Sequence, residues 1–223
     1  MVDVVSQAEP GLRERKKQRT RALLIEAAIE LCDRQGFEQT TVEQIAAVAD
    51  VSPRTFSRYF ATKDAVVLAF VDEVIGMVAL ELAAQPAGIG DLEALYRAHV
   101  AAFLKTKSAA PSGLTSERLL ASARIVTSSP TLMQSASEFR ADAVNVVLAR
   151  RMGVAGDDRR LKLTAVVWAS IIMTGIADLG SRADWARVTV DDIVEEIKTT
   201  YADFREVAAG VHQPGQPAVA QLQ

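Results

Sequence analysis

The chain has 223 residues, of which 49% are apolar and 24% charged, with a formal net charge of −3. So many apolar residues exclude wholesale disorder, and 12 glycines with 7 prolines are too few for a collagen-like or low-complexity chain. The small negative charge excludes a generally basic nucleic-acid coat, so any affinity for a polyanion must be local.

Cysteine, histidine and apolar runs exclude further classes of protein. The single cysteine, Cys32, excludes an intramolecular disulfide and a multi-cysteine zinc site, so we expect no metal and no cofactor. The N-terminal residues contain no apolar run typical of a signal peptide. The stretch from Leu163 to Ala177 is uncharged but shorter than the roughly 20 residues that a membrane span needs. We therefore expect a buried helix there, no membrane partner and a cytoplasmic protein.

Positive charge is concentrated near the start of the chain. Residues 13–21 read RERKKQRTR, whereas the chain after Lys63 holds more acidic than basic residues. Two interpretations are open for this run alone. It is either the solvated beginning of a helix or a basic arm that contacts phosphates.

A first helix is predicted over residues 13–35. Its apolar positions recur at helical spacing and end before Gly36; they are Leu24, Ala27, Ala28 and Leu31. Cys32 neighbours this stripe, which favours a buried, inert thiol.

A second, short helix is predicted over residues 41–49. Thr40 and Glu43 have the spacing of a capping box, and Thr41 with Gln44 would serve nearly as well. About eight residues are too few for an isolated helix to be stable in water, so this helix must pack on a neighbour.

A third helix is predicted over residues 53–60, after a turn at Asp50 and Val51. Ser52 is a good N-cap and Pro53 suits the first helical position. Phe56 and Phe60 are four residues apart and should face inward together. Arg54, Ser57 and Arg58 fall on another face of the same helix.

Two short helices joined by a tight turn, with a third behind them, form a helix-turn-helix, whose second short helix enters the major groove of DNA. Arginine there can reach two acceptors on guanine, and neighbouring hydroxyl and amino groups suit phosphates. The candidate DNA contacts are Lys16, Lys17, Arg19, Thr41, Pro53, Arg54, Thr55, Ser57, Arg58, Tyr59 and Lys63.

The run GFEQTTVEQIAAVADVSPRTFSRYFATKDAVV, residues 36–67, resembles the DNA-binding domain of the TetR family of transcriptional regulators. Its Gly-Phe, Thr-Thr-Val, Ile-Ala, Val-Ser, Thr-Phe, Tyr-Phe and Lys stand at the family's spacings. The resemblance covers about residues 15–70 and implies a homodimeric repressor whose C-terminal helical domain binds a small effector. Asp50 stands where the family commonly has Gly, and Ser57 where Tyr is frequent, which shifts base reading onto Arg54 and Arg58.

The rest of the chain predicts further helices and no strands, so the fold class is all-α with about nine helices. The remaining predicted helices cover about 63–84, 91–107, 114–127, 130–152, 157–180 and 189–209. The predicted domains are a flexible arm over 1–12, a helix-turn-helix domain over 13–64, a helical effector-binding and dimerisation domain over 65–209 and a flexible tail over 210–223.

The last two predicted helices favour a dimer. The helix over 189–209 has one apolar stripe, whereas the helix over 157–180 is apolar on all sides and should be buried on all sides. One side can face its own core, and a second copy of the chain would cover the other. A single large monomeric core is the alternative. The candidate interface residues are Leu161, Ile172, Ile193, Ile197, Tyr201 and Phe204.

Bulky residues within the C-terminal helices are candidates for an effector pocket; they are Phe103, Met133, Phe139, Asn145 and Trp168. The alternative is that they are ordinary core residues. The helical layout looks closest to the branch of the family with an acyl-CoA-like ligand domain, which implies a small hydrophobic effector of that class.

The sequence thus predicts a ligand-responsive regulator, most simply a repressor, that binds a pseudo-palindromic DNA operator as a homodimer. No Ser-His-Asp set, P-loop or Gly-rich dinucleotide loop is present, so we do not expect an enzyme. The alternative function is a helical carrier or sensor of hydrophobic ligands that has no sequence-specific DNA binding.

Overall fold

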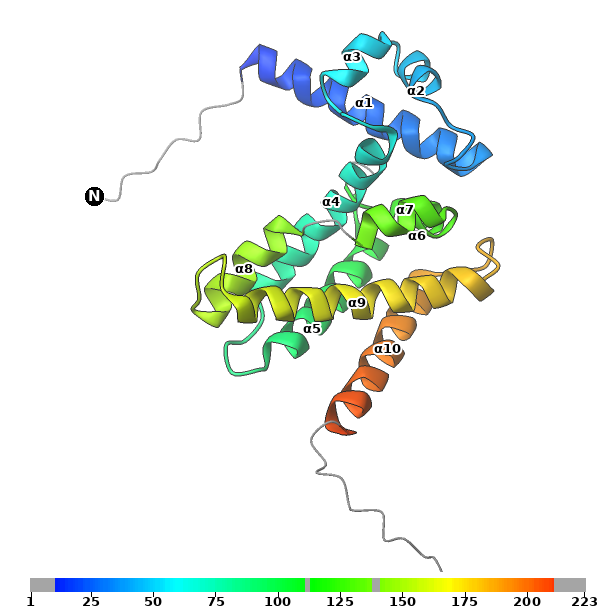
Figure 1. Ribbon diagram of the computed structural model, residues 1–223. Helices are drawn as coiled ribbons and strands as arrows, with labels where there is room; N and C mark the ends of the chain where they lie inside the picture. The colour runs from blue at the N-terminus through cyan, green and yellow to red at the C-terminus, as the bar shows by residue number, and fades with distance from the viewer. Residues whose placement is uncertain (1–10, 111–112, 138–140, 211–223) are drawn as a thin grey trace, which may run out of the picture. The chain divides into compact units, whose positions relative to one another are not determined.

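The computed structural model describes residues 11–110, 113–137 and 141–210, and in these ranges it contains helices and no β-strand (Figure 1). The all-α expectation is therefore confirmed. The candidate residue Phe139, residues 1–10 of the predicted arm and residues 211–223 of the predicted tail lie outside the described residues. The helices are α1 (Leu12–Gln35), α2 (Val42–Val48), α3 (Pro53–Ser57), α4 (Lys63–Ala83), α5 (Asp91–Lys105), a 3-10 turn (Thr106–Ser108), α6 (Ser116–Thr127), α7 (Pro130–Ser137), α8 (Asp142–Met152), α9 (Arg159–Arg182) and α10 (Val190–Gly210).

The chain divides into two compact units. The first contains the described residues of 1–74 and 120–140, and the second contains those of 75–119 and 141–223. This division differs from the boundary at residue 64 that the sequence suggests. Helices α4 and α6 each run across a boundary, and α7 belongs with the N-terminal helices.

In the first unit, α2 packs against α1 and α3 packs against α2 (Figure 1). The predicted apolar stripe of α1 is buried, and Cys32 lies beside it with a burial that raises the pKa of its thiol. Ile45 from α2 and Phe56 from α3 are also fully buried. Each short helix therefore depends on its neighbours for stability, as their lengths require.

Helices α6 and α7 are fastened to the end of α1 by polar contacts. Arg124 Nε donates to Oδ1 of Asp33 over 2.7 Å, and the hydroxyl of Ser129 donates to the carboxylate of Glu38. The same hydroxyl accepts from the backbone N–H of Leu132, so it also caps the start of α7. These contacts explain why residues 120–140 belong to the first unit.

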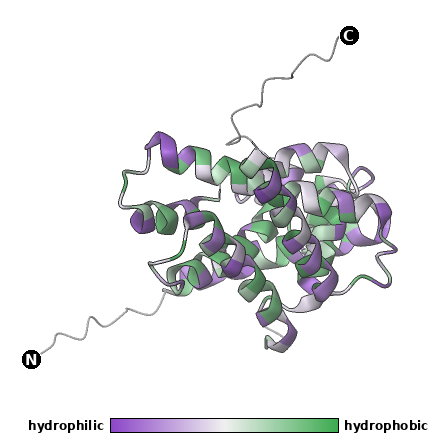
Figure 2. Cartoon of the chain, turned by 90° about the horizontal axis from the view of Figure 1, so that it is seen from below, coloured by the Kyte–Doolittle hydropathy of each residue, from purple (hydrophilic) through white to green (hydrophobic). Residues whose placement is uncertain are grey.

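In the second unit, α10 packs against both α9 and α5, and α8 packs against α9 and α5. Most helices carry hydrophobic and hydrophilic residues along their length (Figure 2), as expected for helices that bury one face. Ile193, Ile197 and Tyr201 form the stripe of α10 that is buried within this unit.

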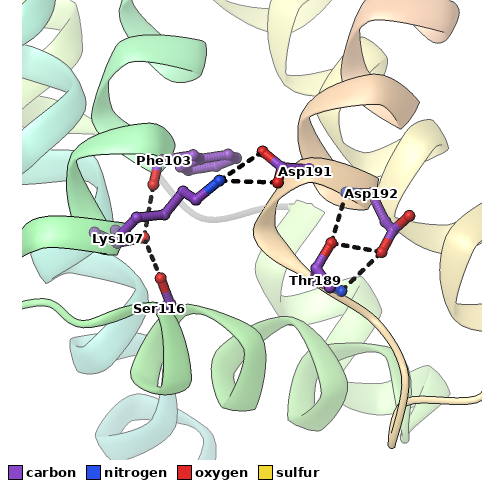
Figure 3. Close-up of polar contacts among 7 residues, drawn as sticks. Phe103, Lys107, Ser116, Thr189, Asp191 and Asp192 are labelled. Carbon is purple, nitrogen blue, oxygen red and sulfur yellow. Dashed lines mark hydrogen bonds and ion pairs between the residues drawn. The ribbon is translucent and has the colours of Figure 1, made fainter.

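The 3-10 turn that follows α5 is tied to the start of α10 (Figure 3). Lys107 Nζ lies 3.0 and 2.8 Å from the two carboxylate oxygens of Asp191. Thr189 and Asp192 form a reciprocal cap, because the Asp192 carboxylate accepts from the backbone N–H of Thr189 and the Thr189 hydroxyl accepts from the N–H of Asp192. The position at which α10 begins is thus fixed by both local and tertiary contacts.

Two further features set the geometry of the second unit. A Cβ on Gly175 of α9 would lie 2.9 Å from Oγ1 of Thr200 on α10, so glycine allows the close approach of these helices. The nearly buried Arg151 of α8 donates to the carbonyl oxygens of Gln85, Pro86 and Ile89, and thereby holds the loop between α4 and α5.

His99 on α5 is buried among aromatic rings and has a partner that sequence reasoning missed. Its Nδ1 lies 2.9 Å from the carbonyl oxygen of Leu95, so Nδ1–H donates there and Nε2 can accept from Nε1–H of Trp168 at 3.3 Å. Both ring nitrogens of neutral histidine are then satisfied, whereas imidazolium would place two donors against each other. Burial lowers the pKa of His99 to about 4, partly offset by the hydrogen bond to Leu95.

Because the pKa of His99 differs between the folded and unfolded states, we expect the free energy of unfolding to depend on pH. The folded pKa of about 4 lies below the unfolded value of 6.5, so His99 stabilises the fold fully above about pH 6.5 and this contribution is lost as the pH falls towards 4. The shift corresponds to about 3 kcal/mol. Urea unfolding measured across this window should show a shallower decline for His99→Gln than for wild type; parallel declines would contradict the assignment.

Candidate nucleic-acid interface

Helix α2 begins with a capping box at Thr41 and Gln44, not at Thr40 and Glu43. The Thr41 hydroxyl accepts from the N–H of Gln44, and the Gln44 side chain accepts from the N–H of Thr41 at 3.0 Å. Thr40 is instead buried and donates to the carbonyl oxygen of Gly36. The preferred pair was wrong because burial of Thr40 removes it from the cap.

The turn between α2 and α3 contains a left-handed residue. Asp50 has φ 54°, and among the described residues it is the one non-glycine residue with positive φ. The sequence anticipates this geometry, because Asp50 stands where related sequences commonly have Gly. An aspartate in this conformation costs about 1 kcal/mol relative to glycine.

Replacing Asp50 with glycine should therefore leave stability unchanged or raise it by up to about 1 kcal/mol. Relief of the backbone strain stabilises the folded state, and the greater freedom of glycine in the unfolded chain offsets part of this gain. Asp50→Ala is the matched control and should destabilise, since alanine tolerates this conformation poorly. Thermal melts of both variants test the prediction, and a clear loss of stability in Asp50→Gly would contradict it.

Helix α3 is positioned by a cap at one end and by two buried rings beneath it. The Ser52 hydroxyl accepts from the N–H of Thr55 at 3.1 Å, and Pro53 occupies the first turn. Phe56 and Phe60 are both buried, with ring centroids 5.8 Å apart. The helix ends at Ser57 rather than at residue 60, but the N–H of Phe60 still bonds to the carbonyl of Phe56, so the two rings keep a helical spacing.

The opposite face of α3 is open. Arg54, Ser57 and Arg58 are all exposed. Ser57 donates to the carbonyl oxygen of Pro53, so its hydroxyl is engaged within the helix, and the two guanidinium groups are the long, charged side chains of this face. A helix that presents two arginines outward while two phenylalanines hold it from behind has the geometry of a DNA-reading helix.

Several flanking candidates have intramolecular partners as well. Lys63 Nζ donates to the carbonyl oxygen of Phe37 over 2.6 Å and lies 4.1 Å from the centroid of its ring. Thr55 shares a hydrogen bond with the Ser52 hydroxyl, and Thr41 serves in the cap of α2. Tyr59 is half-buried. These intramolecular contacts hold the residues in place beside α3, and the predicted contacts with DNA would be additional to them.

The basic run near the N-terminus is helical. Helix α1 begins at Leu12, and the side chains of Lys16, Lys17 and Arg19 are exposed along it. The guanidinium carbon of Arg21 lies 5.3 Å from the centroid of the Phe60 ring, so the last residue of the basic run contacts the segment that follows α3.

The candidate effector residues have different environments. Phe103 and Trp168 are buried and both contact His99, at centroid distances of 6.0 and 5.1 Å, so they fill the core of the second unit. Asn145 and Met133 are half-buried, and Met133 belongs to the first unit.

An open cleft of about 640 Å³ lies elsewhere, between the end of α9 and the first half of α10, and includes Arg182, Arg187 and Glu195. In the described part of the chain, no cluster of His, Cys, Asp or Glu could hold a metal ion.

The candidate dimer residues are mostly covered by their own chain. Leu161, Ile193, Ile197 and Tyr201 are buried in the second unit, and Ile172 and Phe204 are half-buried. The apolar stripe of α10 packs on α9 and α5 of the same chain, and the use of these residues in a dimer stays a prediction.

Helix α9 is also not buried on all sides. Leu163 and Val166 are 58% and 63% exposed, on the side opposite the buried Trp168 and Ile171. By length and composition α9 could cross a membrane, and only 22% of its most apolar stretch is buried. Within one chain, α9 therefore leaves an uncovered apolar face.

The first unit defines the class of protein: a helix-turn-helix DNA-binding protein, in which α2 and α3 form the motif and α1 supports it. The model of bacterial regulatory proteins of the tetR family matches residues 24–70. The HTH-type transcriptional regulator TcmR of Streptomyces glaucescens is 34% identical over 166 residues, which is 73% of this chain and 74% of that protein. The chain belongs to the TetR family of transcriptional regulators.

Solved structures with a similar fold include two named repressors. FadR of Thermus thermophilus, a TetR family transcriptional repressor in complex with lauroyl-CoA, is 24% identical with a TM-score of 0.49 and covers 90% of this chain and 99% of its own. SmeT, the repressor of the Stenotrophomonas maltophilia multidrug efflux pump SmeDEF, is 20% identical with a TM-score of 0.47 and covers 88% of this chain and 94% of its own.

Proposed function

We propose that the protein is a repressor that binds a pseudo-palindromic operator as a homodimer and is released by a small hydrophobic effector. The observation that carries this proposal is the exposed pair of Arg54 and Arg58 on α3, above the buried Phe56 and Phe60. Arginine offers two donors to guanine in the major groove. The exposed basic run of α1, with Lys16, Lys17 and Arg19, supplies charge for phosphates.

The uncovered face of α9 supports the dimer. Leu163 and Val166 lie on one stripe with Ser170, and all three are exposed. A spanning helix would be surrounded by lipid, whereas Trp168 and Ile171 on the other side of α9 are already covered by protein. A second copy that covers the exposed stripe would pair two reading helices, which matches a two-fold symmetric operator.

The effector is proposed to be acyl-CoA-like, and to act by a population shift. A ligand weakens operator binding only by its differential affinity for the conformer with misplaced reading helices. Helix α4 is continuous from Lys63, which is fixed to the Phe37 carbonyl, to Ala83, and it is the proposed lever. Titration of acyl-CoA thioesters of increasing chain length, with free CoA as control, should raise the operator Kd; an unchanged Kd across the series would refute this ligand class.

The experiment that tests DNA reading is selection of duplexes by the purified protein, followed by binding measurements with Arg54→Ala. Loss of a bidentate arginine should cost about 1–3 kcal/mol and relax specificity at one position of each half-site. Arg97→Ala on α5 is the matched control, because Arg97 is an exposed arginine paired with Glu93 and lies in the second unit.

Two outcomes would change the proposed function. Equal binding of selected and random duplexes by wild type would favour a carrier or sensor of hydrophobic ligands. Unchanged specificity in Arg54→Ala, with intact binding, would place base reading on other residues of the interface.

A further inference from the structure

Arg151, in the last turn of α8, is a cation that the second unit holds almost entirely out of water. Its side chain is 10% exposed, and its Nε lies 3.2 Å from Oδ1 of Asp91. Its two terminal nitrogens donate to the carbonyl oxygens of Gln85, Pro86 and Ile89 at 3.2, 2.6 and 2.7 Å. A buried guanidinium is tolerated only with such partners, so this arrangement is a built one.

The partners of Arg151 belong to the ends of two helices. Gln85 is fixed to α4, because its N–H donates to the carbonyl of Leu82 and its side chain donates to the carbonyl of Glu81. Asp91 is the first residue of α5. Arg151 therefore connects the end of α8 with both the end of α4 and the start of α5.

The chemistry of this connection is specific to arginine. The carbonyl groups at the end of α4 carry partial negative charge, which favours a cation there. Hydrogen bonds from an ionised donor are about twice as strong as neutral ones. A lysine would keep the charge, but its ammonium lacks the planar fork that reaches several acceptors at once. The guanidinium thus makes the link between α8 and α4 rigid as well as attractive.

Helix α8 lies among the helices that carry the effector candidates. It packs against α9 and α5, which carry Trp168 and Phe103, and it contains Asn145. A ligand that displaces α8 also displaces Arg151, and the carbonyl groups held by Arg151 move with it. The end of α4 then moves too, and α4 is continuous to Lys63.

We propose that Arg151 is the positioning residue that passes a displacement of α8 to α4. This inference rests on the proposed function and deepens it, because it names the connection through which the effector domain controls the proposed lever. Coupling between two sites is reciprocal. If opening of α8 weakens operator binding through Arg151, bound operator must stabilise α8 by the same factor, so the test needs no effector.

The test measures hydrogen exchange of the backbone amides of α8, with and without a duplex selected by the protein itself. The duplex is saturating, so differences in operator affinity do not enter the comparison. Arg151→Gln removes the link. Arg150→Gln removes the neighbouring, exposed arginine of α8, and Lys105→Gln removes the exposed ion pair that joins α5 to Glu81 of α4. Circular dichroism verifies that each variant is folded.

In wild type, the duplex should slow exchange in α8 by about fivefold or more, the lower end of typical coupling between sites. Arg150→Gln and Lys105→Gln should retain this slowing, whereas Arg151→Gln should bind the duplex without it. Arg151→Lys should retain only part of it, and this variant decides the question if Arg151→Gln does not fold.

Two results overturn the role of Arg151 and leave DNA binding intact. One is unchanged exchange in α8 of wild type when the duplex binds, and the other is equal slowing in wild type and in the Arg151 variants. A wild type that selects no duplex overturns the proposed function itself, and this inference with it.

Discussion

The double variant Leu163→Arg/Val166→Arg should be monomeric and should lose operator affinity by about 100-fold or more. Both side chains stand on the uncovered stripe of α9, where a partner would bury them. Two arginines placed against an apolar partner surface would be desolvated without counter-ions, which disfavours association strongly. A single reading helix then engages one half-site without the gain from the second. Sedimentation velocity and operator titration measure the two effects.

Leu80→Arg is the matched control for this variant. Leu80 on α4 is 72% exposed, so the substitution also exchanges an exposed leucine for arginine, but it lies on neither α9 nor α10. This control should remain dimeric and bind the operator normally. A double variant that stays dimeric would place the interface elsewhere, and a wild type that sediments as a monomer would refute the dimer.

Phe56→Ala should destabilise the first unit by about 3–5 kcal/mol, as is typical for truncation of a buried phenylalanine. Phe56 is 1% exposed and its ring packs against Phe60. Helix α3 has only five residues, so it cannot persist without this support. Operator binding should be lost at temperatures where wild type still binds.

The two tryptophans make the location of this effect measurable. Trp168 and Trp185 both belong to the second unit, so their fluorescence reports that unit, whereas operator binding reports the first. Phe56→Ala should abolish operator binding. Its unfolding transition followed by tryptophan fluorescence should shift less than the unfolding transition followed by circular dichroism. Phe56→Leu should cost about 1 kcal/mol and retain binding. A loss below about 1 kcal/mol in Phe56→Ala would contradict the bracing role of the ring.

Arg151 shows why some structural residues have no signal in the sequence. It is separated by more than sixty residues from the carbonyl groups that it holds, and nothing near it in the chain distinguishes it from an exposed arginine. The same holds for Arg124 with Asp33 and for His99 with Trp168. Such pairs become visible only when the helices that carry them have been placed.

The sequence by itself determined the helix-turn-helix. Caps, the proline at the start of α3 and the spacing of Phe56 and Phe60 act over at most four residues, so the printed order of residues contains them. The left-handed conformation of Asp50 was indicated only by the resemblance to a family that commonly has Gly at that position. Even there, the sequence favoured the capping pair Thr40 and Glu43 over Thr41 and Gln44, and the burial of Thr40 reversed that choice.

Only the tertiary structure decided which apolar faces are used inside the protomer. The stripes of α9 and α10 were apparent in the sequence, but a stripe does not state whether its own chain or a second copy will cover it. Packing of α10 against α5 and α9 buries Ile193, Ile197 and Tyr201 and leaves Leu163 and Val166 exposed. The physical reason is that hydrophobic burial has no direction, so the partner of each face follows from the arrangement of all helices together.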